Sequence, residues 1–169
     1  VVLNGSHEFV VDFLLRMTRP HQVAARVVIP PPVIPRMIQA LSDNIENYKK
    51  RFGEPKLHDA AQPKPDQPQP QVNAQELYDQ LKWGKTEMSC TYANAVMIGH
   101  TPTEFSFDFI TTFFPKSVVS SRVFMSAPNV PRLLESLKHS WTQYEKKLKD
   151  VQNPPPPPSG QESFDTTQF

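Results

Sequence analysis

The charged residues whose spacing most resembles a site are two Asp–Arg pairs, Asp12 with Arg26 and Asp108 with Arg122. In both pairs, each residue lies in a run where apolar and polar side chains alternate, which is typical of β-strands. A carboxylate facing a guanidinium across a hairpin can fix the strand register or belong to an active site. We favour the first interpretation and predict two structural salt bridges.

Other residue types that carry chemistry lack the required spacing. None of the five histidines pairs with another at metal-ligand spacing, and we expect His7 and His100 to be solvated turn residues. Cys90 has no adjacent His, Lys or Arg to activate its thiol, so a small buried residue is expected. The Gly-Lys-Thr run at 84–86 lacks the upstream glycine of a phosphate-binding loop. The sequence therefore predicts no catalytic residue, metal or cofactor.

The elements that position the two pairs form two similar sets. In each set a short apolar run precedes an alternating strand, and a third strand follows at 23–29 or at 118–125. Placing each aspartate opposite its arginine puts the apolar residues of the hairpin on one face and the charges on the other. An amphipathic helix then begins near a proline, Pro35 or Pro131. Each set predicts three strands followed by a helix.

The two sets are copies of one unit at an offset of 96 residues. The strand motif Glu-Phe-x-x-Asp-Phe begins at residues 8 and 104, and the motif Pro-x-x-Pro-Arg begins at residues 32 and 128. A fixed offset is typical of internal duplication. We predict an α+β fold in which two tandem β-β-β-α units form a pseudo-twofold pair, with an antiparallel sheet and helices packed on it. Of two arrangements, one six-stranded sheet is favoured over two sheets packed face to face.

Composition divides the chain into four segments: a first unit at 1–53, a Pro/Gln-rich linker with a short helix at 54–91, a second unit at 92–150 and a Pro-rich tail at 151–169. The second unit begins with Tyr-Ala-Asn at 92–94, which has no counterpart in the first. We therefore expect a trimmed N-terminus. The sequence leaves open whether the trimmed part was a targeting segment.

The tail combines a run of prolines with a polar strip that holds two phenylalanines. Proline cannot join a helix interior or a central strand, and a proline run forms a stiff spacer. Such a strip is typical either of disorder or of a docking peptide. We expect it to lie on a partner chain with one phenylalanine as an anchor. The predicted docking residues are Pro154, Pro155, Pro156, Pro157, Pro158, Phe164 and Phe169.

Composition also narrows the function. A net charge of +1 excludes a strongly basic chain, and no apolar run approaches the roughly 20 residues of a membrane helix. We expect a non-enzymatic structural or interaction subunit of a larger cytoplasmic protein assembly, docked through the linker and tail. Residues 1–53 and residues 92–149 nevertheless each carry seven Lys/Arg against four Asp/Glu. The alternative is therefore a regulatory protein that binds single-stranded nucleic acid.

The second unit resembles a known family. The matching motifs are Tyr-Ala-Asn at 92–94, His-Thr-Pro at 100–102, Glu-Phe at 104–105, Asp-Phe at 108–109, Arg-Val-Phe-Met-Ser at 122–126, Pro128 and Gln-Tyr-Glu at 143–145. This pattern is similar to the short bacterial and archaeal proteins grouped as domain of unknown function 3467. The resemblance implies a small, cytoplasmic, dimer-forming fold, here as a tandem copy with an added linker and tail. It implies no activity, cofactor or site residue.

Overall fold

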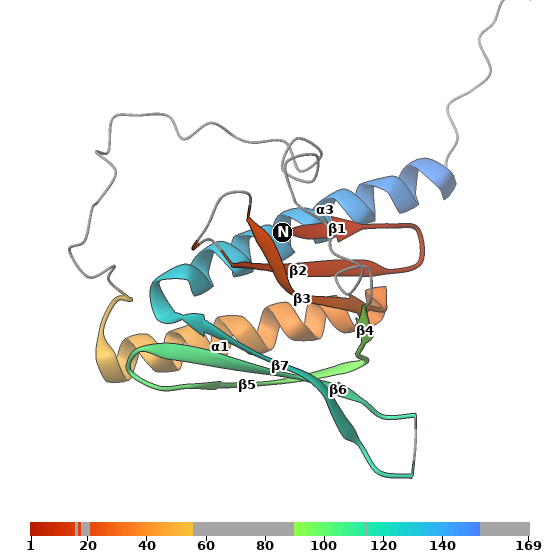
Figure 1. Cartoon of the computed structure of the whole chain (residues 1–169). Coiled ribbons are helices and arrows are strands. Elements are labelled where there is room, and N and C mark those ends of the chain that lie inside the picture. The colour runs from red at the N-terminus through yellow and green to blue at the C-terminus, as the bar shows by residue number, and fades with distance from the viewer. Residues whose placement is uncertain (16, 18–20, 56–89, 114, 153–169) are drawn as a thin grey trace, which may run out of the picture.

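The computed structural model describes residues 1–15, 17, 21–55, 90–113 and 115–152 (Figure 1). Within these residues the chain has a mixed α+β fold with two α-helices and two β-sheets. The expected α+β class is therefore confirmed. Most of the predicted linker and nearly all of the predicted tail lie outside the described residues.

The first sheet has the strand order β1 (Val2–Asn4), β2 (Phe9–Leu15), β3 (Gln22–Ile29) and β4 (Thr91–Tyr92). The first three strands are antiparallel, and Asp12 lies opposite Arg26 across β2 and β3. Phe9, Val11 and Phe13 consequently share one face and are buried. Strand β4 comes from much later in the chain and pairs parallel with the outer edge of β3.

The second sheet contains β5 (Ala95–His100), β6 (Glu104–Thr111) and β7 (Val118–Ser126), all antiparallel. Asp108 lies opposite Arg122, and the ladder has a bulge one residue after Phe109. The favoured single six-stranded sheet is wrong, since the structure has two separate sheets. The physical reason is that β4 occupies the edge of β3, so β3 and β7 do not pair.

The two helices begin after similar Pro-containing turns. A short 3₁₀ turn, η1 (Pro31–Val33), leads into α1 (Ile34–Phe52), and η2 (Ala127–Asn129) leads into α3 (Val130–Gln152). Proline fits the first helical turn because its missing N–H would have no intrahelical acceptor there. Gly53 follows the last residue of α1 as its C-cap, and its φ of 80° is a conformation that favours glycine. None of the described helices is both long and apolar enough to span a membrane.

Helix α1 follows the strands of the first sheet but contacts the second sheet, and α3 follows the second sheet but contacts the first. Helix α1 lies against β5, and α3 lies against β1 (Figure 1). The hydroxyl of Tyr48 donates to the carbonyl of Pro102 at 2.7 Å, and the hydroxyl of Tyr144 donates to that of Ser6 at 3.5 Å. The two contacts correspond at the 96-residue offset, because Tyr144 lies 96 residues after Tyr48 and Pro102 lies 96 residues after Ser6. The core is consequently shared by both sheets and both helices.

Candidate interaction site

The two Asp–Arg pairs have the same geometry. Arg26 donates from Nε to Asp12 Oδ1 at 2.7 Å and from Nη2 to Oδ2 at 2.6 Å. Arg122 donates to Asp108 through the same two nitrogens at 2.5 and 2.7 Å. Two parallel charge-assisted bonds fix both side chains. This geometry fits pairs that align neighbouring strands.

The pairs differ in burial. The side chains of Asp12 and Arg26 are 0% and 18% exposed, whereas those of Asp108 and Arg122 are 12% and 57% exposed. The hydrogen bond from Arg122 lowers the pKa of Asp108 below its ordinary 3.8; burial opposes this shift, and the positive charge reinforces it. The same hydrogen bond raises the pKa of Arg122. Both groups therefore stay ionised at neutral pH, which does not suit a general acid or base.

Other titratable residues do not form a reactive cluster. Across the described part of the chain, no group of three His, Cys, Asp or Glu residues is placed to hold a metal ion. The expectation for His100 is wrong: its ring contacts Tyr48 and Phe105, and its Nδ1 lies 3.3 Å from Asn44 Oδ1. Helix α1 of the first unit covers this turn. Cys90 is exposed rather than buried.

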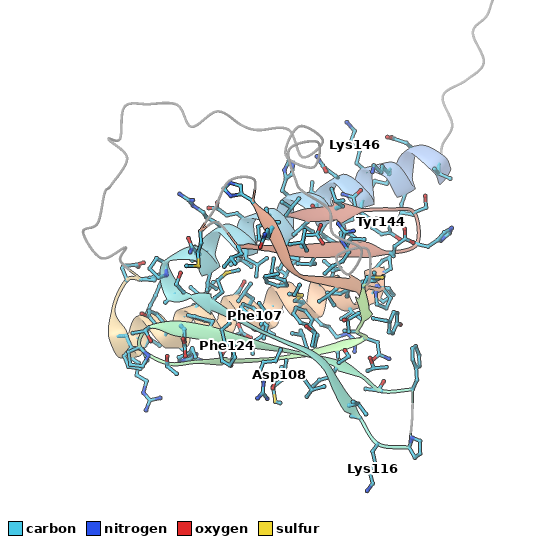
Figure 2. All side chains as sticks on the ribbon, viewed as in Figure 1. Phe107, Asp108, Lys116, Phe124, Tyr144 and Lys146 are labelled. Carbon is cyan, nitrogen blue, oxygen red and sulfur yellow. The ribbon has the colours of Figure 1, made fainter. Side chains whose placement is uncertain are left out.

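The two faces of the second sheet differ in what covers them. Figure 2 shows Phe107 on the side that faces the helices and Asp108 on the opposite side. Phe107 is fully buried, whereas Met97 and Phe124 are 59% and 61% exposed. Met97 lies opposite Asp108, and Phe124 is two residues beyond Arg122, so these four side chains share a face. We call Met97, Asp108, Arg122 and Phe124 the outer face.

A groove of about 410 Å³ lies beside the outer face, between β7, α3 and the adjoining ends of β2 and β3. Its apolar lining comes from both units. The apolar lining includes Leu15, Ala24, Val123, Phe124, Met125 and Leu133. The groove therefore joins the second sheet to the first beside β7, which is an edge strand among the described residues.

The sequence expectations missed both surfaces. The predicted docking residues Pro154, Pro155, Pro156, Pro157, Pro158, Phe164 and Phe169 lie outside the described residues. The available signal was the consecutive apolar run Val-Phe-Met at 123–125, which breaks the alternation of a half-solvated strand. Such a run places apolar residues on both faces of β7.

Comparison with known proteins gives a family. Residues 1–57 and 58–152 match the family model described as "Protein of unknown function (DUF3467)". No curated protein and no solved structure matches the chain. Together the two matched segments span most of the sequence, and both Asp–Arg pairs fall within them. The chain therefore belongs to the DUF3467 family.

Proposed function

We propose that this protein is a non-enzymatic interaction subunit of a larger protein assembly and that the outer face is a contact surface. The observation that carries the proposal is the exposure of Met97 and Phe124 on one side of the sheet, at 59% and 61%. Scattered exposed apolar residues are ordinary, but apolar groups gathered on one face are typical of binding surfaces. Met, Phe and Arg are also enriched at protein interfaces.

The Asp108–Arg122 pair adds polar specificity to this surface. The pair joins β6 to β7, with Met97 opposite Asp108 on β5 and Phe124 two residues beyond Arg122 on β7. Arg122 uses two of its five N–H donors on Asp108, and its side chain is 57% exposed. Its orientation is thus fixed while donors remain for a partner carbonyl or carboxylate.

The proposal includes a tandem duplication in which the two units exchange helices. It is supported by the two family matches and by contacts that recur at 96 residues, such as the Tyr48 and Tyr144 hydroxyl bonds. Because each helix covers the inner face of the other unit's sheet, the outer face of the second sheet is left for partners. The Pro-rich linker and tail would supply further contacts to partner chains.

A regulatory protein that binds single-stranded nucleic acid is the second candidate. Tyr92 and Phe113 stack with ring centroids 5.1 Å apart and are 36% and 68% exposed, which suits base stacking. The phenylalanines of β6 are buried, so they offer no stacking platform. Oligonucleotide affinity that falls steeply with salt would favour this candidate.

The test uses the tagged full-length chain in its native cells. Met97→Ser removes an exposed apolar side chain from the outer face, and Met17→Ser is the matched control because Met17 is 83% exposed outside this face. We expect stoichiometric partner chains with wild type and control. With Met97→Ser, recovery should fall by about tenfold, as expected for losing one buried methionine. Equal recovery with both variants would contradict the outer face as the contact surface.

A further inference from the structure

The hairpin of β6 and β7 carries exposed apolar side chains at the end where the two strands are joined. Figure 1 shows this hairpin extending away from both helices, and Figure 2 shows Lys116 at its far end. Phe113, Val118 and Val119 are 68%, 51% and 45% exposed. We call Phe113, Lys116, Val118 and Val119 the hairpin tip. Apolar groups that gather on a protruding element are typical of a binding surface.

The hairpin tip is apolar on both of its faces. Val118 lies opposite Thr111, and Val119 lies opposite Ile110, which precedes Thr111 on β6. Successive residues of a strand point to opposite faces, so the two exposed valines point in opposite directions. A flat protein surface would cover only one of them. The interfacial region of a lipid bilayer surrounds an inserted group and would cover both.

Side-chain bonds and a ring contact fix the base of the hairpin tip. Asn94 donates from Nδ2 to Thr112 Oγ1 at 2.8 Å and accepts from the amide of Thr112 at 3.1 Å. The hydroxyl of Thr111 donates to the carbonyl of Tyr92 at 2.7 Å. The ring of Tyr92 stacks on Phe113 with centroids 5.1 Å apart, so the tip is exposed with β4 already in place. A tip held in this way loses little conformational freedom on binding.

The charge of this segment suits an anionic surface. Residues 109–121 contain Lys116 and no aspartate or glutamate. Asp108 and Arg122, which flank the segment, neutralise each other in their ion pair. A lysine near an anionic lipid surface contributes about 1 kcal/mol to binding. Tyrosine is enriched at the level of the lipid headgroups, which suits Tyr92 at the base of the tip.

We propose that the hairpin tip inserts into the headgroup region of an anionic lipid bilayer. This inference goes beyond the proposed function, because it assigns a ligand to a surface other than the outer face. Proteins that bind single-stranded nucleic acid use a positively charged groove along the backbone, whereas residues 109–121 offer one lysine. The lipid contact should be weak and reversible, since even a myristoyl chain alone gives only marginal binding.

The experiment measures sedimentation of the purified chain with vesicles at millimolar lipid concentrations. One set of vesicles contains equal parts of phosphatidylglycerol and phosphatidylcholine, and the other contains phosphatidylcholine alone. Phe113→Ser removes an exposed ring from the tip, and Val151→Ser is the control because Val151 is 79% exposed near the end of α3. We expect wild type and Val151→Ser to bind the anionic vesicles, and Phe113→Ser to bind them about tenfold more weakly.

Two further variants test the charge and the insertion separately. Lys116→Gln should weaken binding to the anionic vesicles by about fivefold, the loss expected for one lysine near the surface. Phe113→Trp places an indole in the tip, where its emission should shift to shorter wavelength on the anionic vesicles and be quenched by brominated acyl chains. Wild type, measured in parallel, gives the emission of Trp83 and Trp141.

Several results would overturn the inference: no binding of wild type to the anionic vesicles, equal binding by Phe113→Ser and Val151→Ser, or unchanged emission from Phe113→Trp. If Phe113→Ser does not fold, the loss expected for Lys116→Gln decides the question. Binding of an oligonucleotide or a protein through Phe113, without vesicle binding, would assign the tip to that partner and reject the lipid site. Met97→Ser tests the outer face separately, so this rejection would retain the proposed function.

Discussion

The edges of β3 and β7 show how one strand changes the surroundings of equivalent residues. Val27 and Ile29 on β3 are 0% and 1% exposed, whereas Val123 and Met125, 96 residues on, are half-buried. The residue types are similar, so the difference lies in their neighbours. Strand β4 lies along β3, and β7 borders the groove. The comparison indicates that the exposure of Val123 and Met125 reflects their neighbours and does not reflect a polar sequence.

The Asp–Arg pairs give a second comparison with the same lesson. Their bonds are equivalent, but the carboxylate of Asp12 is fully buried and Arg122 is 57% exposed. The stabilisation from an ion pair depends strongly on its access to water. The two pairs should therefore respond differently to the same substitution.

The largest expected effect comes from removing the buried arginine. Arg26→Met removes both hydrogen bonds that Arg26 donates to the buried carboxylate of Asp12 and should lower the free energy of unfolding by about 3 kcal/mol. Arg122→Met, the matched control, should lower it by much less because its pair reaches water. Urea unfolding of both variants measures the difference. Equal losses would contradict the assigned burial.

The next largest effect should come from supplying the missing neighbour of β7. A copy of residues 91–96 can be fused directly before Val1. Because Val1 is equivalent to Met97, the copy would precede Val1 in the same way that β4 and the start of β5 precede Met97. Filling the groove should raise the free energy of unfolding by about 2 kcal/mol, the value for burying one valine-sized side chain. A repeat with Ala93→Leu is the control.

A smaller effect concerns pH. The hydrogen bond from Arg122 lowers the pKa of Asp108, so the folded state favours the ionised carboxylate. The resulting stabilisation is present above the ordinary pKa of 3.8 and is lost as pH falls through the lower folded value. The difference in free energy of unfolding between wild type and Asp108→Asn should therefore narrow as the pH falls from about 5 to about 2, a range that spans the ordinary pKa of aspartate. A difference independent of pH would contradict the pairing.

The smallest effect is expected for Met97→Ser. Met97 is 59% exposed, so the substitution should change the free energy of unfolding by less than about 0.5 kcal/mol. Thermal unfolding in parallel with the Met17→Ser control checks this expectation. A large loss would show that Met97 packs in the fold and would remove it from the contact surface.

Local features of the fold could be predicted because the sequence pattern contains them. Alternation fixes the hairpin register that puts Asp12 opposite Arg26, and prolines with apolar stripes mark the helix starts. The packing of α1 against β5 could not be predicted, because the apolar stripe on α1 shows that the helix is buried without showing which sheet covers it. The parallel pairing of β4 involves only two residues and has no pattern of its own.

The site was less predictable than the fold. A buried and an exposed strand face both contain phenylalanine, as Phe107 and Phe124 show. Only the position of α1 decides which face meets water. The groove depends on residues from both units, such as Ala24 and Val123, that no sequence spacing brings together. The 96-residue offset becomes informative about the groove only after β4 is seen on β3.

The most direct test of the comparison between β3 and β7 is amide hydrogen exchange on the chain with and without the added repeat of residues 91–96. The account predicts that exchange slows by about tenfold or more in residues 123–126, where the added strand pairs with β7. Residues 22–29 of β3 should change less, because β4 already lies along that edge. Slower exchange confined to β3, or unchanged exchange in β7, would contradict the claim that a neighbouring strand accounts for the different exposure of the two edges.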